Sequence, residues 1–469
     1  MDDDSSVRIS DELRTWVRAA GPGARLPSTR SLVQRHRAGP GTVQRALGRL
    51  VAEGLVESRP GVGAFVRTPR TLRPPDYGWQ TAALGSPRAR LQRGSTMRSA
   101  PEGVIGLHGG YPDRELLPER LVRAALGRAA RGPGALARPP VAGLPELQAW
   151  FAQELAEAVP AGVGAPTASD PIILPGSQSG LSSVFRALVG VDQPLLLESP
   201  TYWGAISAAR QAGVRLVPVP AGADGPDPVE LERAFEETGA RAFYAQPAFA
   251  NPTGVQWSTE RAEQVLAVVR RHGAFLVEDD WAHDFAITGS VRPVAALDDS
   301  GHVVHLRSLT KSVSPALRVG AVTARGPARE RILADRGAEG LYVSGLLQAA
   351  AVDVLTQPGW RTHLRGLREQ LRARRDLLVA SLARSAPQAT LERVPAGGLN
   401  LWVRLPDGTD VDQVARRCER DGLLVAPGDE WFPAEPAGPF VRLNYAGPDP
   451  GSFEAGARVL GEVLTGSGR

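Results

Sequence analysis

The chain has 469 residues, 42% of them hydrophobic, and a formal net charge of +4, which indicates a globular protein of about two to four domains. The single cysteine, Cys418, excludes an internal disulfide, and the seven histidines show no metal-ligand spacing, so we expect no metal. No apolar run reaches the roughly 18 residues of a membrane span, and the acidic start MDDDSSVR lacks the apolar core of a signal peptide. We therefore expect a cytoplasmic chain without a membrane partner.

The charge is unevenly distributed along the chain. Twelve arginines lie from Arg14 to Arg73, against only Glu53 and Glu57, so this segment carries +10. Because the whole chain carries +4, the remainder carries −6. This asymmetry indicates a small anion-binding module joined to a larger, mildly acidic body, and double-stranded DNA is the anion we expect.

Residues 7–67 are predicted to form three helices and a hairpin. Ile9, Leu13 and Val17 space a first amphipathic helix, and Ser28 is placed to cap the second. The third helix begins near GPGTV and ends at Glu53-Gly54. Its spacing predicts a buried stripe of Val43, Ala46, Leu47, Leu50 and Val51. LVESRPGVGAFVR then alternates around a turn as a two-stranded ribbon, so we expect a winged helix-turn-helix over residues 5–68.

Polar and basic side chains gather where a winged helix meets DNA, with its third helix in the major groove and its wing near the minor groove. The candidates are Ser28, Thr29 and Arg30 at the second helix, Thr42, Gln44, Arg45 and Arg49 on the outer face of the third, and Arg59 and Gly61 in the wing. A protein-interaction module with an incidentally basic surface is the alternative, and the dense arginine on these faces argues against it.

Residues 69–103 are rich in Pro, Arg, Ser and Gly and show little periodicity, which indicates a linker with one short helix near Trp79 to Leu84. From residue 104 to about 466, short apolar runs such as PLLLES, AFLVEDD and VVHLRSL alternate with helical stretches. This alternation predicts an α/β domain with a mostly parallel, buried sheet. Ligands in such domains bind beyond the carboxyl ends of the strands.

Polar side chains follow several of the predicted strands. Ser177 and Gln178 stand at a probable helix start that suits a phosphate, although an ordinary helix cap is the alternative. Tyr202 is placed to stack on a planar ring or to pack in the core. Asn251 is placed to donate to a ring oxygen or to form a plain Asn-Pro turn. Asp279 follows a buried strand, where it either caps a helix or pairs with a cation such as a protonated pyridine nitrogen.

Lys311 is the only lysine among the chain's 54 lysine and arginine residues. Arginine would serve at least as well at the surface, whereas only an amine forms a Schiff base with a carbonyl. An accident of an arginine-biased composition is the alternative. Ser308 and Thr310 precede this lysine and Arg318 follows it, as groups that suit a phosphate. With the polar residues above, they describe a site for pyridoxal 5′-phosphate.

The order of these motifs resembles two known families. RLPSTRSLVQR, TVQRALGRLVAEGLV and RPGVGAFV resemble the GntR-type winged helix over about 60 residues, and SQSGL, SPTYWG, NPTG, EDD, SLTKSVSPALRVG and FVRLN resemble fold type I aminotransferases over about 360. The second resemblance implies that Lys311 forms the internal aldimine, Asp279 pairs with the pyridine nitrogen, Asn251 bonds the phenolic oxygen and Tyr202 stacks on the ring. It assigns the phosphate to Ser177, Gln178, Ser308 and Arg318.

Two effector-site residues and one departure also follow from the resemblance. Arg442 in PFVRLNYAG corresponds to the arginine that grips a substrate carboxylate, with a sheet-edge surface charge as the alternative. Asn400 in GGLNLWV stands where an aromatic residue or histidine is often seen, which suggests a changed ligand pocket. Trp281 stands where the family commonly has tyrosine, and an indole does not ionise near neutral pH. This departure puts efficient turnover in doubt more than cofactor binding.

A GntR-like winged helix, a linker and an aminotransferase-like body together resemble the MocR/GabR type of transcription regulator. The resemblance implies a regulator that senses an amine or amino acid through aldimine exchange at Lys311, and a head-to-tail homodimer. An effector acts by binding two conformations unequally. The alternatives are a true aminotransferase with an accessory basic head, and a DNA-binding protein with a cofactor-free body.

Overall fold

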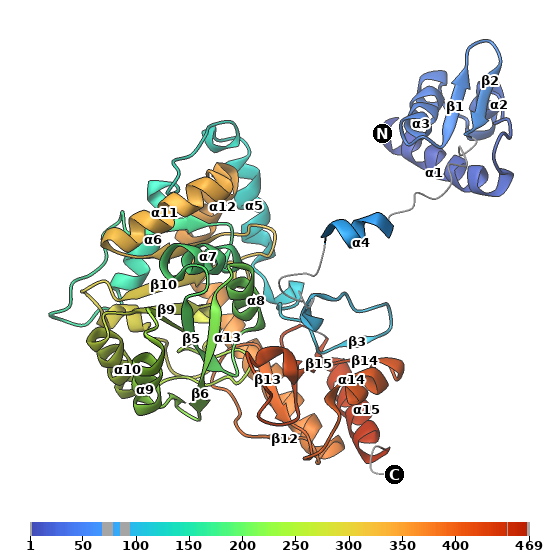
Figure 1. Cartoon of the computed structure of the whole chain (residues 1–469). Coiled ribbons are helices and arrows are strands. Elements are labelled where there is room, and N and C mark those ends of the chain that lie inside the picture. Colours follow the sequence, from blue (N-terminus) through green and yellow to red (C-terminus); the bar gives the residue numbers. More distant parts are fainter. Residues whose placement is uncertain (1, 68–77, 85–93, 448, 467–469) are drawn as a thin grey trace. The chain divides into compact units, whose positions relative to one another are not determined.

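Two compact units make up the chain, Met1–Arg88 and Ala89–Arg469, in a computed structural model that describes residues 2–67, 78–84, 94–447 and 449–466 (Figure 1). The linker expected over residues 69–103 falls partly outside the described residues. Its expected short helix is present as α4, Gly78–Leu84. Among the described residues, no helix is both long and apolar enough to cross a membrane.

The first unit is a winged helix, as the sequence predicts. Ile9, Leu32, Val43 and Leu50 are fully buried in one core that holds the three helices against the hairpin. Ser28 caps the second helix, because its side chain accepts a hydrogen bond from the backbone N–H of Ser31. The elements are α1 Asp2–Ala20, α2 Thr29–His36, α3 Pro40–Ala52, β1 Val56–Arg59 and β2 Gly63–Val66.

The second unit is built on an eight-stranded sheet in the order β4-β11-β10-β9-β8-β5-β6-β7. Strands β10, β9, β8, β5 and β6 run parallel to one another, β11 lies antiparallel between β10 and β4, and β7 is antiparallel to β6. The mostly parallel sheet expected from the sequence is therefore confirmed. Its strands are β4 Pro171–Leu174, β5 Pro194–Ser199, β6 Arg215–Gly222, β7 Gly225–Pro226, β8 Ala242–Ala245, β9 Phe275–Asp280, β10 Val303–Ser308 and β11 Gly320–Thr323.

Both faces of this sheet are buried, which explains why its strands are continuous apolar runs in the sequence. Leu195 and Leu197 face a core under α7, α8 and α11, whereas Leu196 faces a core under α9 and α10 (Figure 1). Helices α5, α6 and α12 cover the β4 end on that second side. The bounds are α5 Glu119–Ala129, α6 Pro145–Ala156, α7 Ser177–Val184, α8 Trp203–Gln211, α9 Pro228–Thr238, α10 Thr259–Arg271, α11 Gly326–Gly340 and α12 Gly345–Thr356.

A smaller sheet follows the long helix α13, Pro358–Ser385, in the order β12-β13-β16-β15. Helices α14, Val411–Arg420, and α15, Phe453–Gly466, belong to the same part of the chain (Figure 1). β3, Ile105–Gly106, pairs in parallel with β14, Leu423–Leu424, so the segment that follows the linker is joined to this part. The sheet strands are β12 Thr390–Leu391, β13 Asn400–Arg404, β15 Ala426–Pro427 and β16 Phe440–Asn444.

Candidate functional site

A cavity lies where the parallel strands of the large sheet end. Its wall contains all ten residues that the sequence places around the cofactor, and two others, Tyr111 and Gln246. Asp279 and Ser308 lie at the carboxyl ends of β9 and β10, and the other eight come from segments that follow β4, β5, β8, β9 and β10. They are Ser177, Gln178, Tyr202, Asn251, Asp279, Trp281, Ser308, Thr310, Lys311 and Arg318.

Lys311 lies in a turn after β10 and is half-buried. Its Nζ lies 4.2 Å from the centroid of the Trp281 ring and 5.9 Å from that of Tyr111. Burial, and after it the positive charge of Arg442, lower the pKa of Lys311 from 10.5 to about 7, against the opposing effect of Asp279. The neutral amine, which is the nucleophilic form, is therefore well populated at mildly alkaline pH.

The carboxylate of Asp279 is buried, and only one of its two oxygens accepts hydrogen bonds. Tyr244 donates its hydroxyl to Oδ2 at 2.9 Å and Gln246 donates its amide at 2.8 Å. Oδ1 is buried with no hydrogen-bond partner. Burial raises the pKa of Asp279, while the two hydrogen bonds and the charge of Lys311 act in the opposite direction. A cationic group in the cavity would stabilise the ionised carboxylate.

One end of the cavity is shaped to admit a compact anion. Ser177 begins α7, where backbone N–H groups and the helix dipole favour negative charge. The Gly176 before it has φ +94°, and a Cβ there would lie 2.7 Å from Nη2 of Arg318 and 3.3 Å from Oγ1 of Thr310. Only glycine therefore fits this turn while leaving the arginine and the hydroxyl in place.

Asn251 and Tyr202 also line the cavity. The backbone N–H of Asn251 donates to Oε1 of Gln246 at 2.9 Å, and its own Oδ1 is buried without a partner. The Tyr202 hydroxyl donates to Oε1 of Gln178 at 3.1 Å. Burial raises the pKa of Tyr202, so its phenol stays protonated.

Trp281 lies directly after β9 and is 5% exposed. Its Nε1 is buried with no hydrogen-bond partner, and its ring packs against Phe285 with centroids 6.2 Å apart. The indole therefore presents an N–H that is free to donate beside the amine of Lys311.

Arg442 lies on β16 in the smaller sheet, and it is 1% exposed. It donates through Nη1 to Oδ1 of Asn400, and through Nη2 to the carbonyls of His108 and Gly109, both at 2.7 Å. Its guanidinium lies 5.1 Å from the Trp431 ring centroid. Burial lowers the pKa of Arg442 to about 10. Because Arg442 is buried, the alternative interpretation of this residue as a surface charge at a sheet edge is wrong.

The sequence reasoning missed the partners that hold the named residues. Gln246 follows β8 and bonds both Asp279 and Asn251, and its place after an apolar run is the signal that would have found it. Tyr244 is buried inside β8 and gives no such signal. Tyr111 comes from a segment more than 60 residues before the first of the named residues, so only the folded chain brings it to the cavity.

A buried ionic cluster supports the opposite face of the sheet behind the cavity. Asp280 accepts from Nδ1 of His283 at 2.6 Å and from Nε2 of His305 at 3.2 Å. Burial opposes the charged form of His283, yet Asp280 and Glu154 raise its pKa to about 9. Arg307 completes the cluster with bonds to Glu154 and Asp284. The cluster fixes the strand ends that carry Asp279 and Ser308.

Most of the candidate DNA-contacting residues are exposed in the winged helix. The exposed ones are Ser28, Thr29, Arg30, Gln44, Arg45, Arg59 and Gly61, and Arg49 is partly exposed. The Arg59 guanidinium lies 4.7 Å from the ring centroid of Phe65 in the wing, and it pairs with Glu57.

The expected orientation of Thr42 is wrong. Thr42 is only 5% exposed, and its Oγ1 accepts a hydrogen bond from Nη2 of Arg45 at 3.2 Å. Val51, expected in the buried stripe, is 42% exposed. The stripe of α3 is therefore turned slightly from the predicted one, because α3 packs against both α1 and β1. Thr42 therefore contacts the Arg45 side chain from inside and is not part of the exposed face of α3.

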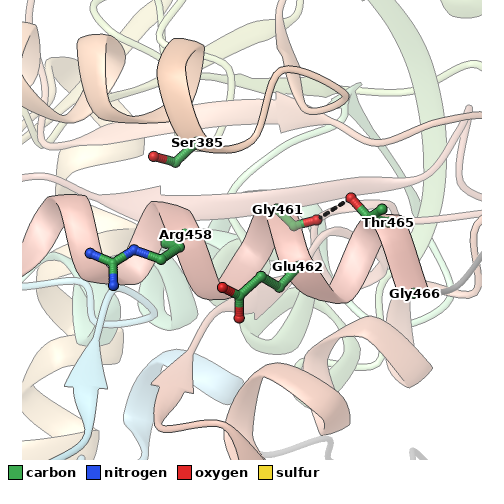
Figure 2. Close-up of a pocket in the computed structure, with 6 residues that line it drawn as sticks. All are labelled: Ser385, Arg458, Gly461, Glu462, Thr465 and Gly466. Atoms are coloured by element: carbon green, nitrogen blue, oxygen red, sulfur yellow. Dashed lines mark hydrogen bonds between the residues drawn. The ribbon is translucent and has the colours of Figure 1, made fainter.

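A second hollow lies along α15, beside the end of α13 (Figure 2), and it shares no lining residue with the Lys311 cavity. Its Thr465 hydroxyl donates to the Gly461 carbonyl of the same helix at 2.8 Å, so it is engaged within the helix. None of the side chains in its wall is among the buried, unpartnered groups found in the described residues. It is lined by Ser385, Arg458, Gly461, Glu462, Thr465 and Gly466.

The Lys311 cavity fits pyridoxal 5′-phosphate. Buried polar atoms are nearly always hydrogen-bonded, so several unpartnered ones around a single cavity indicate a polar ligand. The carboxylate suits a ring nitrogen, the amide N–H of the Asn251 side chain and the indole N–H of Trp281 suit the phenolic ring oxygen, and the glycine turn with Arg318 suits a phosphate. The unpartnered atoms are Asn251 Oδ1, Asp279 Oδ1, Trp281 Nε1 and Thr310 Oγ1.

Comparison with known proteins agrees with both parts of this description. Residues 103–460 match the family model for aminotransferase class I and II, and residues 5–66 match that for bacterial regulatory proteins of the gntR family. The probable rhizopine catabolism regulatory protein MocR of Rhizobium meliloti is 30% identical over 98% of this chain and 94% of its own length.

Two enzyme matches cover the larger unit. The 2-aminoadipate transaminase of Thermus thermophilus is 30% identical over 82% of this chain and 97% of its own. The structure of alpha-aminoadipate aminotransferase LysN from Thermus thermophilus, complexed with N-(5′-phosphopyridoxyl)-L-leucine, is 28% identical with a TM-score of 0.75. It covers 82% of this chain and 98% of that one.

The lowered pKa of Lys311 predicts the pH dependence of its reactivity. Below about pH 7 the amine is protonated and inert, and above it the amine is neutral, so labelling of the cofactor-free protein should rise through pH 7 and not through 10.5. Arg442→Gln should move the midpoint upward, because its positive charge contributes to the shift. Arg404→Gln, in the same small sheet, is the matched control.

The measurement is the rate of trinitrophenylation at Lys311, followed by mass spectrometry, which separates this amine from the α-amino group. A midpoint near 10 in the folded protein would show that the amine is not desolvated.

Proposed function

Because this chain belongs to the class I and II aminotransferase family and carries a gntR-type winged helix, as MocR-type regulators do, we propose that it senses an amino acid and adjusts its DNA binding. In this proposal residues 5–68 bind DNA, residues 69–103 link the units, and residues 104–466 bind cofactor and effector. The observation that carries it is Lys311, the chain's only lysine, held in a cavity with a pKa near 7.

When bound, pyridoxal 5′-phosphate supplies an aldehyde with which primary amines exchange. Lys311 would hold that carbonyl carbon, and Asp279 would keep the ring nitrogen protonated. The side-chain amide N–H of Asn251 and the indole N–H of Trp281 would donate to the phenolic ring oxygen, and Tyr202 would lie against the ring. The phosphate would be held by Ser177, Gln178, Ser308, Thr310 and Arg318, which all line the cavity.

The effector proposed here carries a carboxylate as well as a primary amine. Arg442 is the charged group that supports this, because it is buried and its positive charge acts on Lys311. Asn400 fixes its guanidinium through the bond to Nη1. An amino acid would thus be held at two points, its amino group near Lys311 and its carboxylate at Arg442.

A head-to-tail homodimer is also part of the proposal. Leu136, at 99% exposure, and Leu341, at 61%, leave apolar side chains uncovered on one protomer. Their neighbour Tyr342 is 40% exposed and lies 5.6 Å from the Arg138 guanidinium. Exposed apolar side chains near one another support an interface with a second copy.

An active aminotransferase is the second candidate, favoured by the similarity to the 2-aminoadipate transaminase. Trp281 weighs against rapid turnover, because an indole N–H donates a hydrogen bond but does not ionise near neutral pH. With L-2-aminoadipate and 2-oxoglutarate as probes, we expect a spectral change that stops after one equivalent. Continued formation of glutamate over many equivalents would establish the enzyme instead.

The proposed function is tested by Lys311→Arg, which keeps the positive charge and removes the nucleophilic amine. We expect this variant to lack the yellow absorbance of lysine-bound cofactor and any change in DNA affinity on adding L-2-aminoadipate, L-leucine or other amino acids. Its DNA binding without effector should persist.

Arg368→Lys, which adds an exposed lysine on α13, is the control and should behave as the unaltered protein. An effector response that survives in Lys311→Arg would remove Lys311 from the sensing role.

Arg45→Ala tests the assigned recognition face. Loss of an exposed guanidinium from α3 should weaken binding to a DNA duplex by about tenfold, and a lost phosphate contact should reduce the slope of log affinity against log salt by about 1. Arg18→Ala, on the exposed face of α1, is the matched control and should bind as before. Superimposable isotherms for Arg45→Ala and unaltered protein across a salt series would contradict the assignment.

A further inference from the structure

The hydrogen bonds of Arg442 join the proposed carboxylate site to the segment Gly94–Gly109, which contains the end of the linker and the residues directly after it. We infer that this latch segment is the element that an effector carboxylate releases, so that occupancy of Arg442 is passed to the linker. The inference rests on the proposed function. It adds a route by which effector binding in the second unit acts on the linker to the winged helix.

One nitrogen of Arg442, Nη2, is already committed to the latch segment. Its Nη2 donates to the carbonyls of both His108 and Gly109 at 2.7 Å, and its Nη1 donates to Asn400. Its Nε is buried with no partner. A guanidinium offers a carboxylate two forks, Nε with Nη2 and Nη1 with Nη2, and both include an Nη2 hydrogen. A two-point carboxylate contact must therefore displace one of the two latch carbonyls.

The other end of the latch segment is held by Glu430, which lies between β15 and β16 of the smaller sheet. The backbone N–H of Ser95 donates to the two carboxylate oxygens of Glu430 at 2.9 and 3.0 Å, and its hydroxyl donates at 3.0 Å. Glu430 precedes Trp431, whose ring lies 5.1 Å from the Arg442 guanidinium. The charge of Glu430 also acts on Arg442 directly.

A third contact runs along the latch segment itself. Nε2 of His108 lies 2.8 Å from the carbonyl of Arg98, and the carbonyl of the same His108 accepts from Arg442. The Arg98 side chain pairs with Glu419. Gly94 lies tightly against Trp203, since a Cβ there would be 2.9 Å from the ring. A shift of the His108 backbone would therefore change its contact with the Arg98 carbonyl. Arg98 directly follows the turn Ser95–Met97, so the shift would reach that turn.

This arrangement predicts a signal that depends on the carboxylate and not on cofactor occupancy alone. A negative group at Arg442 competes with the latch carbonyls for the hydrogens of Nη2. Displacement of the His108 backbone then reaches Ser95 through the contact of His108 with Arg98. An amine without a carboxylate does not make this change.

The test compares two probes that differ in one group, applied to the full-length protein. N-(5′-phosphopyridoxyl)-L-leucine carries a carboxylate, and N-(5′-phosphopyridoxyl)-3-methylbutylamine is the same adduct without it. Hydrogen–deuterium exchange of the peptide covering Ser95 should accelerate by about tenfold with the first, the factor expected when one hydrogen bond to a charged group is lost. It should stay unchanged with the second.

Glu430→Gln supplies the matching variant, because an amide holds the Ser95 N–H and hydroxyl more weakly than a carboxylate does. Exchange at Ser95 should be fast in this variant before any probe is added, and the leucine adduct should raise it little further. Glu462→Gln, the same change on α15, is the control and should reproduce the unaltered protein.

The possible outcomes distinguish an error in the latch inference from an error in the proposed function. If the leucine adduct fails to bind, or if Arg442→Gln leaves its affinity unchanged, the proposed effector site is wrong and the latch falls with it. If the leucine adduct binds through Arg442 and exchange at Ser95 matches that seen with the amine adduct, only the latch is overturned.

Discussion

Removing one amine from water is the constraint on which the rest of the larger unit depends. Lys311 is reactive near neutral pH because burial and the charge of Arg442 disfavour its protonated form, and both act through the fold. The parallel strands bring the polar groups to one edge of the sheet, and the ionic cluster around Asp280 and Arg307 holds that edge from behind. Without this support, Lys311 would lose the surroundings that lower its pKa.

The same two basic groups connect chemistry to regulation. Arg442 lowers the pKa of Lys311 and its hydrogen bonds reach the segment that follows the linker, so a carboxylate at Arg442 would act on both. Neutralising that guanidinium would raise the proton affinity of the lysine amine at the moment the latch loosens. Sensing would then require no large rearrangement of the sheet, only a change in which oxygens one arginine binds.

Much of this was predictable from sequence, because it depends on order along the chain. Apolar runs of fixed length predict buried strands, and the polar residue after each run falls at the shared edge, which is why Asp279 and Lys311 were found. The predictions that failed, and the contacts that were missed, depend on how a helix is rotated about its axis and on which side chains meet in space. The orientation of Thr42 was missed since α3 turns slightly on α1 and β1, and the Asp279 contact of Tyr244 was missed since that residue is internal to a strand. The carbonyls that bind Arg442 carry no side-chain signature at all.

Whether Lys311 binds the cofactor can be measured by reducing the purified, cofactor-loaded protein with borohydride and analysing its peptides by mass spectrometry. Because the chain has a single lysine, we expect one phosphopyridoxyl adduct, on Lys311. An unmodified Lys311 peptide from protein that still carries bound cofactor would contradict it.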